Sequence, residues 1–229
     1  MEIKYLGHSS FLIKSNVEIL IDPFLNDNPS RVGKDVVEVN PDFMLVTHAH
    51  GDHLGDVVEI ALKNENTKVL CIYEIAQYLT SKGVKNVHSM NIGGRFDTGF
   101  GFIKMVSALH SSSIVEDGRI IYGGLAAGFI IGIEGKVIYH AGDTGLFYDM
   151  KLLGEIFKVD LALIPIGGNF TMDTMDALLA LKWIRPKVVI PMHYNTWNII
   201  NADADQFITE AGKLNIVGVK LGINETYRP

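Results

Sequence analysis

Cysteine is almost absent from this chain, in which Cys71 is the single example. One thiol cannot form an intramolecular disulfide, so the sequence excludes a small secreted fold that disulfides hold together. Long apolar runs are missing too, since none reaches the ~18 residues that a membrane-spanning helix needs. The first residues also lack the basic start and long apolar core of a secretory signal peptide. These absences predict a cytoplasmic protein with no membrane partner.

An excess of positive charge is also missing. The chain has 20 basic and 26 acidic side chains, which gives a formal net charge of −6. Such a surface repels phosphate polymers on average, so long nucleic acid is not an expected partner, although a local basic groove can override the average. Hydrophobic residues make up 48% of the 229 residues, and this share is sufficient for the core of one large domain.

The order of the apolar runs predicts the fold class. Short strands separated by turn residues fill the first 22 residues, and strand–helix units follow, with an amphipathic helix expected over 54–63. The second half repeats this order, with strands expected at 100–106, 128–133 and 136–139, and helices near 147–157, 173–184 and 204–214. Two such halves predict an α/β fold, a four-layer αββα sandwich. No linker-like composition separates them, so we predict a single domain over 1–229.

The strongest chemical signal is the segment 47–53, which reads Thr-His-Ala-His-Gly-Asp-His. It follows a predicted buried strand and precedes the amphipathic helix, a position where α/β proteins place their sites. Imidazole and carboxylate ligands suit Zn²⁺, with Mn²⁺ or Fe²⁺ as alternatives. In an irregular loop, His48 and His50 can converge on one ion while Asp52 and His53 turn towards a second. The structural alternative is a polar loop that caps a helix, but a cap needs only one such residue.

Three further candidate ligands each follow a predicted strand of the second half. They are His110, Asp143 and His193. A lone histidine is more often a satisfied core or surface residue than a ligand, but the shared placement at strand ends favours the ligand interpretation. The glycine- and serine-rich stretch 111–127 is long enough to be a functional loop.

With these motifs in place, nearly the whole chain resembles the metallo-β-lactamase superfamily. The segment 48–53 matches the metal motif of that superfamily, and His110, Asp143 and His193 follow in the expected order and spacing. The resemblance implies two divalent cations. One cation takes His48, His50 and His110, the other takes Asp52, His53 and His193, and Asp143 bridges both. It also implies that Asp22, within Leu-Ile-Asp-Pro, braces the metal loop without binding metal.

Finer motifs resemble one branch of that superfamily. Gly-His-Ser-Ser-Phe at 7–11 and Tyr-His-Ala-Gly-Asp-Thr at 139–144 look like its small metal-dependent hydrolases, with ascorbate-phosphate lactonases and a phospholipase D for N-acyl ethanolamine lipids as cousins. His50 occupies the position where oxygen-reducing diiron members have glutamate, which disfavours redox chemistry. Asp143 occupies the position where many β-lactamases have cysteine, which disfavours antibiotic hydrolysis.

These features predict an enzyme, a metal-dependent hydrolase that cleaves an ester, lactone or phosphoester bond of a small-molecule substrate. Two cations that share a bridging water lower its pKa towards neutrality and make hydroxide available. Asp52 is the candidate that orients this hydroxide and receives its proton, besides binding metal. His8 is the candidate that protonates the leaving group, because its neighbours indicate an exposed loop. For His140 we favour a supporting role beside Asp143.

Two other functions remain open at this point. One is a phosphodiesterase that acts on nucleotides or RNA ends, since acidic composition counts against long polymers but not against small cyclic nucleotides. The other is a metal-binding regulatory protein without turnover. The complete set of candidate ligands favours catalysis over the second alternative.

Overall fold

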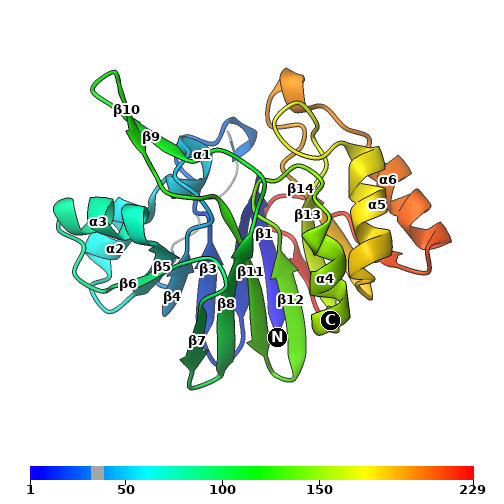
Figure 1. Ribbon diagram of the computed structural model, residues 1–229, viewed down its shortest axis with the longest axis horizontal. Coiled ribbons are helices and arrows are strands. Elements are labelled where there is room, and N and C mark those ends of the chain that lie inside the picture. Colours follow the sequence, from blue (N-terminus) through cyan, green and yellow to red (C-terminus); the bar gives the residue numbers. More distant parts are fainter. Residues whose placement is uncertain (32–38) are drawn as a thin grey trace. The chain divides into compact units, whose positions relative to one another are not determined.

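The computed structural model describes residues 1–31 and 39–229, and these form two compact units. The first unit holds Met1–Gly94, Ser111–Ala126 and Gly222–Pro229, and the second holds Arg95–His110 and Ala127–Leu221. Each unit contains one seven-stranded sheet (Figure 1). Each unit therefore has a mixed sheet with its own helices, as expected for the α/β class, and the first unit also takes up Gly222–Pro229 from the far end of the sequence. The single domain over 1–229 stays a prediction.

The sheet of the first unit has the strand order β16-β1-β2-β3-β4-β5-β6. Its first four strands are antiparallel, and β3 to β6 are parallel. The strands are β1 Glu2–Gly7, β2 Ser10–Lys14, β3 Glu18–Ile21, β4 Phe43–Leu45, β5 Lys68–Ile72, β6 Val87–Met90 and β16 Thr226–Tyr227. The helices are η1 Pro29–Arg31, α1 Gly51–Leu54, α2 Val57–Lys63 and α3 Tyr73–Ser81. Cys71 is buried in β5, and burial raises the pKa of its thiol.

The sheet of the second unit has the order β15-β14-β13-β12-β11-β8-β7. Its strands are β7 Arg95–Thr98, β8 Gly101–Ser107, β11 Ala127–Ile133, β12 Lys136–His140, β13 Leu161–Pro165, β14 Val188–Met192 and β15 Val217–Gly218. Its helices are α4 Asp149–Ile156, α5 Thr174–Ile184, η2 Asn198–Ile200 and α6 Ala204–Lys213, and α4, α5 and α6 lie beside the parallel strands (Figure 1). Because β12 to β15 are parallel, their carboxyl ends share one edge of the sheet.

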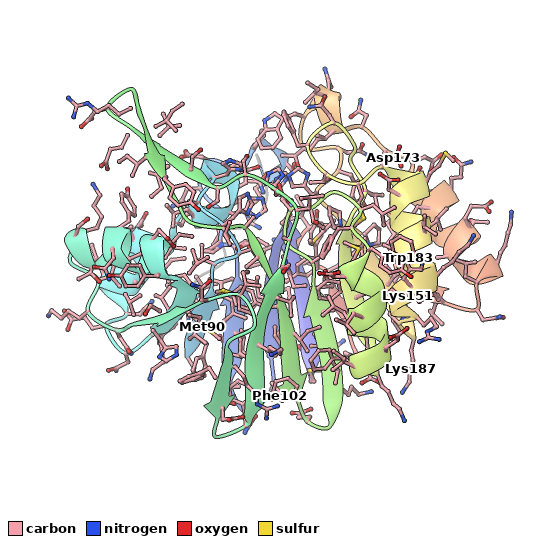
Figure 2. The ribbon with its side chains drawn as sticks, viewed as in Figure 1. Met90, Phe102, Lys151, Asp173, Trp183 and Lys187 are labelled. Carbon is pink, nitrogen blue, oxygen red and sulfur yellow. The ribbon has the colours of Figure 1, made fainter. Side chains whose placement is uncertain are left out.

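Helix α5 shows how local chemistry sets the ends of an element. The carboxylate of Asp173 accepts hydrogen bonds from the backbone N–H groups of Met175 and Asp176, both at 2.9 Å, and so caps the first turn. The helix ends at Arg185, whose left-handed backbone cannot continue it. Near this end the rings of Trp183 and Tyr148 meet edge to face at 5.5 Å and join α5 to α4 (Figure 2).

Among helices of the described ranges, none is long and apolar enough to cross a membrane.

The stretch 111–127 differs from the expected loop, since a hairpin occupies most of it. Strands β9 Ser113–Glu116 and β10 Arg119–Tyr122 pair antiparallel in a two-stranded sheet of their own, and Figure 1 shows them projecting from the rest of the first unit. The turn residues Asp117 and Gly118 have φ values of 50° and 72°. Positive φ at both positions is typical of the two-residue turn that joins twisted strands. The sequence signal of the hairpin is therefore this Asp-Gly pair, with β-branched residues in the strands on both sides.

One stability prediction concerns Asp160, directly before β13. Burial disfavours its charged form, but hydrogen bonds from Lys187 Nζ at 2.7 Å and the Val137 N–H at 2.8 Å outweigh this and lower the pKa of Asp160. A carboxylate with a depressed pKa stabilises the folded state above its unfolded pKa of ~3.9, and this contribution is lost as the pH falls through the folded pKa. We expect Asp160→Asn to lower the free energy of unfolding at pH 7 by about 1 kcal/mol, after allowance for partial exposure.

Urea unfolding at pH 7 and pH 3 measures this effect, and the difference between Asp160→Asn and wild type should shrink at pH 3. Glu65→Gln is the control, because the Glu65–Lys85 ion pair at 3.1 Å is largely exposed and should contribute little. An equal loss for Asp160→Asn at both pH values would contradict the role of its charge.

Candidate metal centre

The metal loop of the first unit, residues 47–53, follows strand β4. His48 and His53 are fully buried, whereas His50 and Asp52 are partly exposed. His48 Nε2 lies 3.0 Å from His50 Nδ1, so two ring nitrogens converge on one point. Two imidazole nitrogens at this distance form a donor set that a divalent cation fits when neither nitrogen carries a proton. The sequence-predicted pairing of His48 with His50 is thus present within this unit.

Asp22 determines which ring nitrogen of His48 and of His53 carries the proton. It is fully buried, and it accepts hydrogen bonds from the Thr47 N–H at 2.8 Å and the Thr47 hydroxyl at 2.7 Å. Its Oδ2 also lies 2.8 Å from His53 Nδ1, so that ring nitrogen donates to the carboxylate. Because the Thr47 hydroxyl donates to Asp22, its oxygen accepts from His48 Nδ1, 3.0 Å away. Both rings therefore keep Nδ1 protonated and leave Nε2 as the ligand atom.

The His8 ring contacts Asp52 of the metal loop, and its Nε2 lies 3.0 Å from Asp52 Oδ2. The sequence indicated an exposed loop, but His8 is 1% exposed and has a φ of 59°. The Tyr5 hydroxyl donates to the His8 carbonyl at 3.1 Å, and the imidazole packs edge-on against Phe24. Ligand atoms of His8, Asp52 and His53 lie within 4.8 Å of one another. His8 is therefore a buried partner of Asp52, and its proton donation to a leaving group stays a prediction.

The base of the β9–β10 hairpin is attached to the same loop. The buried hydroxyl of Ser112 accepts from the Ala49 N–H at 3.1 Å and donates to the Gly123 carbonyl at 3.0 Å. Ser111 Oγ lies 3.4 Å from His50 Nε2, the ring nitrogen that faces away from His48. The sequence placed Ser112 in a candidate functional loop and Thr47 in the metal motif, but it did not predict the roles of their hydroxyl groups, because these depend on contacts with residues distant along the chain or on a neighbouring ring.

We expect Ser112→Ala to lower the free energy of unfolding by about 1–3 kcal/mol, because it leaves the buried Ala49 N–H without its acceptor. It should also loosen the spacing of His48 and His50 and lower the affinity for Zn²⁺ about tenfold. Thermal unfolding and chelator competition measure the two effects. The neighbouring Ser113→Ala is the matched control, and equal losses in both variants would contradict the assignment to Ser112.

The second unit gathers the other three candidates at the carboxyl edge of its sheet. His193 Nε2 lies 2.9 Å from Asp143 Oδ2, and His110 Nε2 lies 3.7 Å from the same oxygen. Asp143 and His193 are buried, and His110 is mostly covered. The loops are tied together, since Thr144 Oγ1 accepts from the Leu109 N–H at 3.0 Å. One carboxylate oxygen therefore faces two imidazoles.

His140 contacts the backbone of the turn before Asp143, and its supporting role beside Asp143 stays a prediction. It is buried at the end of β12, and its Nδ1 accepts a hydrogen bond from the Gly142 N–H at 3.1 Å. This bond holds the turn that carries Asp143. Each unit thus brings its own candidates together, His48, His50, Asp52 and His53 in the first and His110, Asp143 and His193 in the second. That the two sets share cations stays a prediction.

Comparison with known proteins identifies the family. Residues 2–193 match the family model of the β-lactamase superfamily domain. The UPF0173 metal-dependent hydrolase of Carboxydothermus hydrogenoformans is 48% identical over 218 residues, which cover 94% of each chain. A hydrolase of the same name from Methanopyrus kandleri is 48% identical over 217 residues, with the same coverage.

A solved structure agrees with these relatives. The metallo hydrolase Igni18 of Ignicoccus hospitalis superposes with a TM-score of 0.87 at 38% sequence identity, covering 99% of this chain and 97% of that one. These matches confirm the predicted metallo-β-lactamase-like fold class and the hydrolase branch. The chain therefore belongs to the metallo-β-lactamase superfamily and is a metal-dependent hydrolase of its small-hydrolase branch.

Proposed function

We propose that this enzyme cleaves an ester, lactone or phosphoester bond of a small molecule at a centre of two divalent cations, with Zn²⁺ as the first expectation and Mn²⁺ or Fe²⁺ as alternatives. The observation that carries the proposal is the set of contacts around Asp22. This buried carboxylate keeps Nδ1 of His53 protonated, and through Thr47 it does the same for His48. A ring that is protonated on Nδ1 carries its lone pair on Nε2, the atom with which each of these two buried rings would bind metal.

We further propose how the ligands divide. The first cation takes His48, His50 and His110, the second takes Asp52, His53 and His193, and Asp143 serves both. The convergence of His48 and His50 supports the first group. The single Asp143 oxygen that faces both His110 and His193 supports a shared carboxylate, because each of those rings belongs to a different proposed cation.

When bound, such cations activate water at neutral pH and stabilise the negative charge that develops during attack. Asp52 would receive the proton that the attacking water loses. The His8 ring keeps Asp52 Oδ2 in place for this role through the contact at 3.0 Å. Because His8 shares a hydrogen bond with that carboxylate, it can pass a proton on to the leaving group. Tyr5 and Phe24 fix the position of His8 for this role.

Metal analysis combined with a substrate panel tests the proposal. The purified protein, reconstituted with Zn²⁺, Mn²⁺ or Fe²⁺, should bind two ions per chain and turn over members of a panel of carboxylic esters, lactones, thioesters and phosphodiesters. Full activity with one ion per chain would contradict the dinuclear centre. A protein with two ions that turns over no substrate would instead favour a regulatory role. The net charge of −6 supports a small-molecule substrate over long nucleic acid.

A further inference from the structure

We infer that the bond cleaved is an uncharged carboxylic ester or lactone that carries an apolar acyl or alkyl group. This inference rests on the proposed function and narrows it, because phosphoesters are excluded as the preferred substrates. Three observations carry it. Exposed apolar side chains accompany the candidate ligands in each unit, considered separately, and cationic side chains are missing from the segments that hold those ligands.

In the second unit the apolar side chains lie on loops at the carboxyl edge of the sheet. Leu109 precedes His110, while Trp197 and Ile199 follow His193, and all three are exposed. The loop after β13 carries exposed Phe170. This loop packs tightly against the loop of His193, since a Cβ atom at Gly167 would lie 2.2 Å from the His193 carbonyl oxygen. The apolar groups and the candidate ligands therefore belong to one interlocked set of loops.

In the first unit the outer face of the β9–β10 hairpin is apolar. Val115 and Ile120 form a cross-strand pair and are 74% and 79% exposed, and Tyr122 lies on the same face. The opposite face is covered only on the β9 side, where Ile114 is buried and Glu116 accepts a hydrogen bond from the Tyr78 hydroxyl of α3, whereas Ile121 of β10 is 39% exposed. At the hairpin base Gly123 packs so closely on the metal loop that a Cβ atom there would lie 2.3 Å from Ala49 Cβ.

Charge narrows the chemistry of the reacting bond. The segments 47–54, 109–114, 122–126, 141–147, 166–173 and 193–202 hold the candidate metal ligands, and they contain neither lysine nor arginine. The exposed apolar side chains of these segments include Leu109, Tyr122, Phe170, Trp197 and Ile199. Arg119 of the hairpin lies on the face of β10 opposite to Ile120. Proteins that select phosphate esters usually supply arginine or lysine for the phosphate oxygens. Exposed apolar side chains instead gain free energy by covering hydrocarbon. A neutral ester or lactone with an apolar chain suits this combination.

A chain-length series tests the inference on the metal-loaded protein. We expect kcat/KM for p-nitrophenyl esters to rise about twofold per methylene, roughly half the gain of full burial, and so of the order of tenfold from butanoate to octanoate. The octanoate should also exceed bis(p-nitrophenyl) phosphate. Ile199→Ser and Ile120→Ser should each reduce the octanoate-to-butanoate ratio about threefold. Ile156→Ser is the matched control, because Ile156 at the end of α4 is 61% exposed and Ile199 is 59% exposed.

A second measurement needs neither metal nor turnover. In the metal-free protein, saturation-transfer NMR should detect binding of 2-decanone but not of 2-butanone, and Ile199→Ser should weaken the signal while Ile156→Ser keeps it. A flat chain-length series, or a preference for the phosphodiester, would overturn the inference and leave the proposed hydrolase intact. Dissociation of an oligomer by Ile120→Ser or Ile199→Ser, with the chain-length preference unchanged, would also overturn the inference. The exposed apolar side chains would then form an interface between copies of the chain. If no substrate turned over, the proposed function would fail, and ketone binding would still decide whether the loops receive an apolar chain.

Discussion

Replacing His48 and Asp52 together by alanine is expected to remove bound metal and to lower kcat/KM by at least about 10⁴-fold. His48 contributes a fully buried ring whose Nε2 lies 3.0 Å from His50 Nδ1, and Asp52 contributes the carboxylate that contacts His8. The double variant therefore removes one proposed ligand of each cation and the proposed proton acceptor. Because the proposed ligands and the proposed proton acceptor work together, we expect the effects of the two substitutions on kcat/KM not to be additive.

Elemental analysis and initial rates on the best substrate of the panel measure this effect. His88→Ala combined with Asp97→Ala is the matched control, because His88 lies on β6 and Asp97 on β7, away from the loops that hold the candidate ligands. Circular dichroism checks that both proteins remain folded. A metal-free His48→Ala/Asp52→Ala protein that retained activity would refute the assigned roles.

Replacing Asp22 by alanine is expected to destabilise the fold strongly, although Asp22 is not a proposed ligand. The change leaves the Thr47 N–H, the Thr47 hydroxyl and His53 Nδ1 without their acceptor in a fully buried place. Loss of a buried, hydrogen-bonded carboxylate from such a network costs about 3–5 kcal/mol. Because both rings also lose their fixed proton positions, Zn²⁺ affinity should fall about 10- to 100-fold.

Asp22→Asn separates the two effects if the alanine variant does not fold. Its amide oxygen still accepts from the Thr47 N–H, while its NH₂ group faces the His53 ring and should weaken metal binding with a smaller loss of stability. Asp56→Asn is the control, since Asp56 accepts from the Leu25 and Asn26 N–H groups in the same unit. Denaturant unfolding and chelator competition measure both quantities. Unchanged Zn²⁺ affinity in Asp22→Asn would contradict the orienting role.

The elements predicted from the sequence are those with strong local patterns. The helix expected over 173–184 is α5 Thr174–Ile184, since a capping aspartate and a long apolar face mark its bounds. The helix expected over 54–63 begins later, as α2 Val57–Lys63, and a separate short helix, α1 Gly51–Leu54, occupies the end of the expected irregular loop; Gly55 follows α1. There a Cβ atom would lie 2.2 Å from the Pro23 carbonyl oxygen, so the break depends on a contact with a distant residue. Such contacts leave no periodic signal along the chain.

In the candidate site, too, the residues with a local sequence pattern could be predicted, and those that depend on distant contacts could not. His48, His50, Asp52 and His53 are adjacent in the sequence, and their chemistry could be recognised before their geometry was known. Thr47 and Ser112 could not be assigned, because a hydroxyl gains its role only from the Asp22 and Ala49 groups that folding places beside it. The burial of His8 was missed because its flanking glycine and serines are typical of exposed turns, whereas here they are buried with it.

Strand β16 has a consequence for how the protein is made. The short strand pairs Ile3 with Tyr227 and Lys4 with Thr226, and the Tyr5 N–H donates to the Glu225 carbonyl oxygen at 3.0 Å. These partners of β1 lie in the segment Gly222–Pro229, which follows Ala127–Leu221 of the second unit along the chain. The first sheet therefore gains its strand β16 only after Ala127–Leu221 of the second unit have been synthesised, and until then a nascent chain presents β1 as an open edge that a chaperone can bind.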